Sequence, residues 1–135
     1  MLFKRPVITC NGQELNARGG AGMGEISNIS VRAISADANA TLTVADMAGG
    51  AILFTGFTAG RNITTPTAAL IIGAAPDMDI GDSFAITLSV SVAFAGTYVA
   101  GTGVTLVGRA TLPASSSAYV VVTKTSATTV TWTAL

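Results

Sequence analysis

The sequence predicts an all-β protein, a jelly-roll-like sandwich or barrel with one short helix and an extended N-terminal arm. Three observations support this class. Apolar residues alternate with small polar residues over short segments, and those segments are rich in β-branched and aromatic residues. Glycine, proline, asparagine and aspartate cluster between them and supply turns. Seven or eight strands at this spacing are typical of sandwiches, jelly rolls and barrels.

The strongest strand signal lies between Phe84 and Phe94. Every second residue of this segment is a large apolar one, and the residues between are Ala, Thr or Ser. This period of two predicts a long strand with one buried face and a second face that is small and uncharged. Further strands are expected at residues 29–33, 41–44, 51–55, 104–107, 119–123 and 128–133, with 41–44 and 51–55 forming a hairpin around the glycine-containing turn 46–50.

One helix is expected over residues 67–72. Thr65 is a suitable N-cap, Pro66 suits the first helical position, and Gly73 suits the C-terminal end. A helix of about two turns needs packing against the sandwich to be stable.

The chain divides into an extended glycine-rich N-terminal arm, residues 1–25, and a β-sandwich domain, residues 26–135. The arm contains the glycine-rich run 18–24, and residues 6–9 are suited to pairing as a strand. Two interpretations remain open: an arm that adds a strand to a neighbouring molecule, or a frayed terminus. The candidate partner-contact residues are Leu2, Phe3, Lys4 and Arg5.

Charge is scarce in this sequence. Only 10% of the 135 residues are charged, compared with ~25% in an average soluble domain. Either Thr, Ser, Asn and Gly cover the surface of a monomer, or partner proteins cover much of it. Seven basic and seven acidic residues cancel, and the basic ones are scattered. Nucleic-acid binding is therefore not expected, because it depends on a positive field.

No membrane segment or signal peptide is expected. Residues 83–108 carry no charge, but their alternation and their glycines indicate strands. The first residues lack the apolar stretch of a signal peptide. A single cysteine, Cys10, excludes an intrachain disulfide and leaves the compartment undetermined.

The sequence predicts no enzyme, no cofactor and no metal site. It contains no histidine, which excludes Ser-His-Asp, Cys-His and imidazole-metal arrangements. Cys10 has no neighbouring charge to activate its thiol. The acidic segment Asp77–Asp82 begins like a calcium loop, but Leu88 stands where the last carboxylate ligand belongs, so a solvated turn is the favoured interpretation. The glycine-rich segment 101–108 lacks the third glycine of a dinucleotide fingerprint and the lysine of a P-loop.

Four segments in a fixed order resemble a known group of proteins. They are Pro66–Leu70, Gly81–Phe84 at the start of a long strand, Ala100–Gly108, and a terminal strand rich in Thr and Val. This series resembles the β-rich virion proteins of tailed bacteriophages, particularly the jelly-roll-like capsid decoration or cement proteins, over roughly residues 40–135.

The resemblance implies a homotrimer on the outer surface of a phage capsid, where it braces neighbouring subunits of the major capsid protein. It implies a location in the virion and synthesis in the host bacterial cytoplasm. Related domains occur in phage fibres and spikes, so a receptor- or glycan-binding module of a tail fibre or spike is the alternative. The N-terminal arm has no counterpart in the resemblance.

Overall fold

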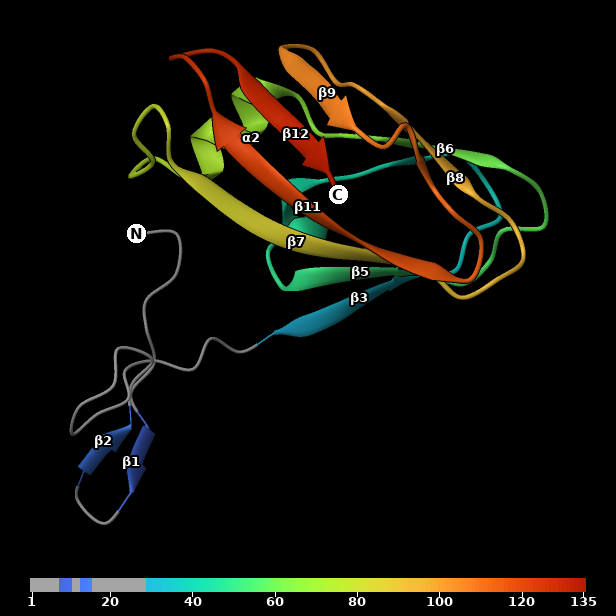
Figure 1. Ribbon diagram of the computed structural model, residues 1–135, viewed down its shortest axis with the longest axis horizontal. Helices are drawn as coiled ribbons and strands as arrows, with labels where there is room; N and C mark the ends of the chain where they lie inside the picture. Colours follow the sequence, from blue (N-terminus) through green and yellow to red (C-terminus); the bar gives the residue numbers. More distant parts are fainter. Residues whose placement is uncertain (1–7, 11–12, 16–28) are drawn as a thin grey trace.

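Two β-sheets form the body of the protein in a computed structural model that describes residues 8–10, 13–15 and 29–135 (Figure 1). The prediction of an all-β class is confirmed. One sheet has the order β3 (Ser30–Ile34), β5 (Gly50–Phe54), β7 (Ser83–Val90), β11 (Ser116–Lys124), β12 (Val130–Ala134) and β9 (Val104–Gly108). The other has the order β10 (Thr111–Leu112), β8 (Gly96–Val99), β6 (Arg61–Thr64) and β4 (Ala40–Thr41).

The first six strands of the body wind between the two sheets. From β3 to β8, successive strands alternate between the sheets, and the strands of each sheet pair in parallel: β5 lies between β3 and β7, and β6 lies between β4 and β8. The last part of the chain is different, because β11 lies antiparallel between β7 and β12. Jelly rolls are built from antiparallel strands. The jelly-roll part of the prediction is therefore not confirmed.

The core lies between the two sheets. On β7, Ile86, Leu88 and Val90 point inward and are almost fully buried, as the period of two predicted. Trp132 on β12 meets Tyr98 on β8 edge to face, with 6.3 Å between ring centroids. Burial of an aliphatic side chain such as Leu88 contributes roughly 1.5–3 kcal/mol to the free energy of folding. The largest fully buried residues are Trp132, Phe54, Phe57, Leu42, Ile52, Ile63, Ile71, Ile86, Leu88, Leu112, Val120 and Val122.

The long strand and the hairpin both differ from their predictions. β7 ends at Val90 and not at Phe94: Ser91 N–H still donates to the Phe54 carbonyl of β5, and the chain then turns into β8. The predicted hairpin is wrong: β4 and β5 lie in different sheets, with a helix between them. Alternating residues show that a segment is a strand, but they do not show which strand it pairs with.

Two helices lie in the described part of the chain, where the sequence predicted one. Helix α2 (Ala68–Ala74) has Thr67 as its N-cap, not Thr65. Thr65 is buried, and its hydroxyl accepts a hydrogen bond from Gly101 N–H and donates to the Pro66 carbonyl. It therefore fastens the chain before the helix to the turn that precedes β9. Gly101 permits this contact, because a Cβ there would lie 2.6 Å from the Pro66 carbonyl oxygen.

The helix that the sequence analysis missed is α1 (Val44–Met47), four residues long. Thr43 and Asp46 form a reciprocal capping box: Asp46 N–H donates to the Thr43 hydroxyl, and Thr43 N–H donates to the Asp46 carboxylate. Arg32 also binds the Asp46 carboxylate, at 3.1 Å. Neither helix in the described residues is long and apolar enough to cross a membrane.

The N-terminal region is described only in part. β1 (Ile8–Cys10) pairs antiparallel with β2 (Gln13–Leu15) in a separate two-stranded sheet. The remainder of the predicted arm over residues 1–25 lies outside the described residues, and the choice between a binding arm and a frayed end therefore stays open.

Candidate interaction surface

The six-stranded sheet has one face turned to the core and one turned away from it. Helices α1 and α2 and the four-stranded sheet all contribute to the buried cluster on the inner face. In Figure 1, α2 lies behind β11 and β12. We call the opposite side the outer sheet face. By strand alternation it consists of Val31, Ala33, Ala51, Leu53, Ser83, Ala85, Thr87, Ser89, Thr105, Val107, Ser117, Tyr119, Val121, Thr123, Thr131 and Thr133.

None of these side chains carries a charge. The charged residues of the body lie in loops, in α1, at strand ends or, as for Arg32, on the other side of an edge strand. Water-facing sheets usually alternate apolar residues with charged or strongly polar ones. The outer sheet face instead combines methyl groups and hydroxyls from edge to edge. The chemistry of this face therefore suits contact with another uncharged surface.

The hydroxyl groups of this face bind one another across neighbouring strands. Ser83 lies opposite Thr123, and their hydroxyl oxygens are 2.7 Å apart. Ser89 lies opposite Ser117 with the same separation of 2.7 Å. Burying a hydroxyl without a partner is costly. Because these four are already paired, the face can lose water at a lower cost than its composition suggests.

Large apolar side chains protrude from the same face. Tyr119 lies in the central strand β11 and is 53% exposed, and Val31 on the edge strand β3 is 63% exposed. Val107 on the opposite edge strand β9 is also exposed. These side chains add exposed apolar area to a face that otherwise consists largely of Ser, Thr and Ala, a mixture that suits contact with another uncharged surface.

A groove of about 460 Å³ lies beside the first half of β7. β5 pairs with β7 only from Thr87 to Val90, so residues 83–86 have no strand on that side within the described chain. The space is bounded by the start of β5, by the two helices and by Tyr119. Its lining includes Ile29, Met47, Ile71, Phe84, Ala85 and Tyr119.

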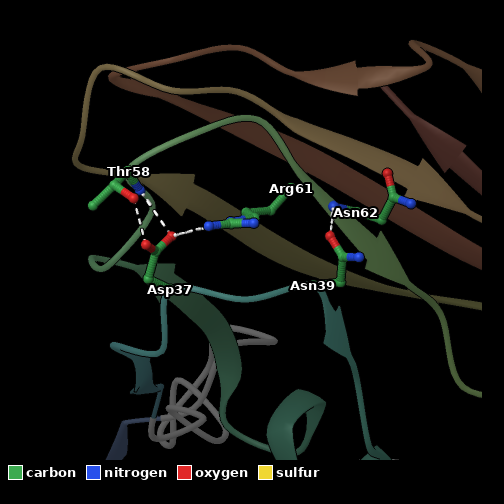
Figure 2. A network of polar contacts seen from close by, with 5 residues as sticks. All are labelled: Asp37, Asn39, Thr58, Arg61 and Asn62. Atoms are coloured by element: carbon green, nitrogen blue, oxygen red, sulfur yellow. Dashed lines mark hydrogen bonds and ion pairs between the residues drawn. The ribbon is translucent and has the colours of Figure 1, made fainter.

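A polar cluster fastens the loops at one end of the sandwich (Figure 2). Asp37, between β3 and β4, accepts hydrogen bonds from the Thr58 backbone and hydroxyl and from Arg61, whose Nη2 lies 2.8 Å from the carboxylate. The hydrogen bonds from Thr58, followed by the one from Arg61, lower the pKa of Asp37 to about 2. Beside this cluster, the Asn39 side chain accepts from Asn62 N–H. All these groups are partnered within the chain, and the cluster holds β3 and β4 to the rest of the sandwich.

The acidic segment Asp77–Asp82 contains a turn. The Asp82 carboxylate accepts from Asp79 N–H at 2.9 Å, and Asp82 N–H donates to the Asp79 carbonyl. Within the described residues, no three side chains of the metal-binding types lie together. The segment 101–108 contains a turn at Thr102–Gly103, followed by β9.

Most of the aromatic side chains described are unavailable for ligand binding. Trp132 and Tyr98 are buried in the core, and neither the Trp132 Nε1 nor the Tyr98 hydroxyl has a hydrogen-bond partner. Burial raises the pKa of Tyr98 to about 12. Tyr119 and Phe94 are exposed, but Phe94 lies in the loop after β7 and not on the outer sheet face.

The candidate contact residues Leu2, Phe3, Lys4 and Arg5 lie outside the described residues. The outer sheet face was foreseen only locally, from the small uncharged residues of the segment 84–94. Its breadth depends on strand pairings that local alternation does not specify.

Comparisons of the chain with protein-family models, with curated proteins and with solved structures found no match.

Proposed function

We propose that this chain is a structural virion protein that binds the outer surface of a tailed-phage capsid as a homotrimer and stabilises contacts between major capsid subunits. The observation that carries the proposal is the outer sheet face, a broad surface without charge that neither helix nor the second sheet covers. The capsid location and the homotrimer are taken from the resemblance of the four ordered segments to decoration proteins.

A decoration protein stabilises a shell by binding the assembled form in preference to free subunits. Such binding requires wide contacts in which no charge is buried without a partner. The scarcity of charge and the paired hydroxyls of the outer sheet face meet this requirement. In this proposal the protein is made in the host cytoplasm, and its fold is a variant of the jelly-roll-like sandwich in which strands β3 to β8 wind in parallel.

The proposed role is not enzymatic and involves no cofactor, nucleic acid or membrane. The chain has no histidine, and its acidic turn binds its own backbone. A protein that acts only through surface contacts needs neither a catalytic residue nor a metal site.

A receptor- or glycan-binding module of a tail fibre or spike is the second candidate. The groove beside β7, with Tyr119 on its margin, is the observation in its favour. Sugar-binding sites commonly place aromatic rings against the ligand, and here Trp132 and Tyr98 are buried. This distribution favours the capsid role.

Co-sedimentation with capsids separates the two candidates. Capsids lacking this protein, from the phage that encodes it, are mixed with the purified, fluorescently labelled chain, and intact host cells are mixed with it in parallel. The capsid role predicts saturable binding to capsids and none to cells. Binding to cells alone would support the fibre or spike module and would contradict the proposal.

A further inference from the structure

Strand β7 has an open backbone edge within the six-stranded sheet. Its pairing with β11 covers the whole strand, whereas its pairing with β5 starts only at Thr87. On that side, the segment 83–86 borders the groove and no strand of the described chain. An open edge of this kind can accept an added strand, which supplies the missing backbone hydrogen bonds.

The hydrogen-bond pattern shows which backbone groups of this edge face the groove. Along a strand, the N–H and C=O groups of alternate residues point to opposite neighbours. The Asp82 carbonyl accepts from Lys124 N–H on the β11 side, so even-numbered residues of β7 face β11. Ser91 N–H donates to a carbonyl of β5, so odd-numbered residues face the β5 side. Ser83 and Ala85 therefore direct their N–H and C=O groups into the groove.

The groove suits an apolar strand. Its lining carries no charge and includes Met47 of α1, Ile71 of α2 and Phe84 of β7. A charged segment would lose its water there without gaining a counter-charge. The edge and the lining together call for an extended segment with one apolar face.

The same chain carries a strand pair that belongs to neither sheet of the body. Among the described strands, β1 and β2 pair only with each other, and each has three residues. A two-stranded hairpin alone is marginally stable in water. Its register places Ile8, Cys10 and Leu15 on one face, and Thr9 and Glu14 on the other. One face of this hairpin is therefore largely apolar and needs cover.

The chain enters the body at the groove. Ile29 lines the groove, and residues 16–28 connect it to β2. A connection of this length spans up to about 43 Å, compared with a radius of gyration of ~13 Å for a 100-residue domain. The hairpin of one copy can therefore reach the groove of an adjacent copy.

We infer that the β1–β2 hairpin of one copy adds to the open edge of β7 in a neighbouring copy, with its apolar face turned toward α1 and α2. Each copy then donates one hairpin and accepts another, a head-to-tail contact that can close into a ring. The contact satisfies Ser83 and Ala85 of one chain and covers the apolar face of β1 and β2 of the next. It does not depend on the capsid role.

Sedimentation velocity of the full chain at micromolar concentration tests this inference with two matched pairs of arginine substitutions. Ala48→Arg places a cation in the groove at the C-cap of α1, and its control Ala45→Arg places one on α1 outside the groove lining. Ile8→Arg places a cation on the apolar face of β1, and its control Thr9→Arg places one on the opposite face. Ala85→Pro, which removes an N–H group directed into the groove, is a second groove variant. Circular dichroism confirms that each variant is folded.

We expect the wild type and both controls to sediment as species larger than one chain of 13.5 kDa. The groove variants and Ile8→Arg should each associate at least about tenfold more weakly, because the arginine would be buried without a counter-charge and the proline lacks the N–H group. Mixing Ala48→Arg with Ile8→Arg should restore one contact, between the intact hairpin of the first and the intact groove of the second, and give a species of two chains.

A monomeric wild type, normal association of the groove and hairpin variants, or an equal loss in the controls would overturn the inference. A mixture that stays monomeric would also overturn it, because the hairpin would then act only within its own chain. The capsid assay gives an independent result: a wild type that associates in this way but ignores capsids contradicts the capsid role alone.

Discussion

The two faces of the six-stranded sheet are built by the same strands and differ in what covers them. On β7, Leu88 and its inward neighbours are sealed beneath the second sheet and the helices, whereas Thr87 and Ser89 point away from the core. The outer face carries no charge, and the inner face carries charge only at its margins, at Arg32 on β3 and at Lys124 at the end of β11. A low charge count is expected for the inner face because it is buried within the chain. On the outer face, neither helix nor the four-stranded sheet of the described residues provides cover, and the proposed contact with another molecule would account for the same low count.

Truncation on the inner face should have the largest effect on stability. Leu88→Ala should lower the free energy of unfolding by about 2–5 kcal/mol, because it leaves a cavity in a core that cannot fully collapse. Thr87→Ala, one residue away on the outer sheet face, should cost less than about 1 kcal/mol. Urea unfolding of both variants measures the difference. If both variants lose the same free energy of unfolding, Leu88 is not more deeply packed than Thr87 and the comparison of the two faces fails.

High pH should weaken the junction between the sheets. The pKa of Tyr98 is raised from 10 to about 12 by burial, so the phenol stays neutral in the folded protein while it ionises in the unfolded chain. The contribution of Tyr98 to the free energy of unfolding is fully present below pH 10 and is lost as the pH rises from 10 to about 12. Thermal unfolding between pH 9 and 11.5 should show this decline.

Tyr98→Phe should flatten that decline and should leave stability at neutral pH unchanged or slightly higher, because the hydroxyl it removes has no hydrogen-bond partner. Tyr119→Phe, on the outer sheet face, is the matched control and should retain the wild-type decline. If Tyr98→Phe and Tyr119→Phe behave alike, the effect does not come from the buried phenol.

The hydroxyl pairs of the outer sheet face should contribute modestly. Ser89→Ala and Ser117→Ala should each lower the free energy of unfolding by about 0.5–1 kcal/mol, and the double variant should cost less than their sum because they share one hydrogen bond. A double-mutant cycle by chemical denaturation measures the coupling. Strict additivity would mean that the two hydroxyls do not interact.

Loss of the Asp37 carboxylate should act locally on the edge of the sheet. Asp37→Asn removes the acceptor charge that holds Thr58 and Arg61, and amide exchange in β3 and at Thr58 should become faster while core amides of β7 are unchanged. The same change should appear in the wild type as the pH falls from 3.8 toward 2, since the pKa of Asp37 is lowered to about 2. Unaltered exchange in β3 would show that other contacts hold this edge.

The sequence alone predicted part of this comparison. Alternation from Phe84 onward identified the strand and its two faces, because each residue's face follows from local geometry, but it placed the end of the strand at Phe94 and not at Val90. The prediction of a hairpin between residues 41 and 55 was wrong, because local alternation does not show that the chain winds between two parallel sheets. Helix α1 was missed although Thr43 and Asp46 have the spacing of a capping box. The outer sheet face appears only when six separate segments are placed side by side.

A density map of the assembled virion tests the central claim most directly. We predict three copies around a threefold axis on the outside of the capsid, with Tyr119 and Val121 of each copy covered by a neighbouring protein. A map in which the outer sheet face is open to solvent, or in which the protein occupies a tail fibre, would contradict it.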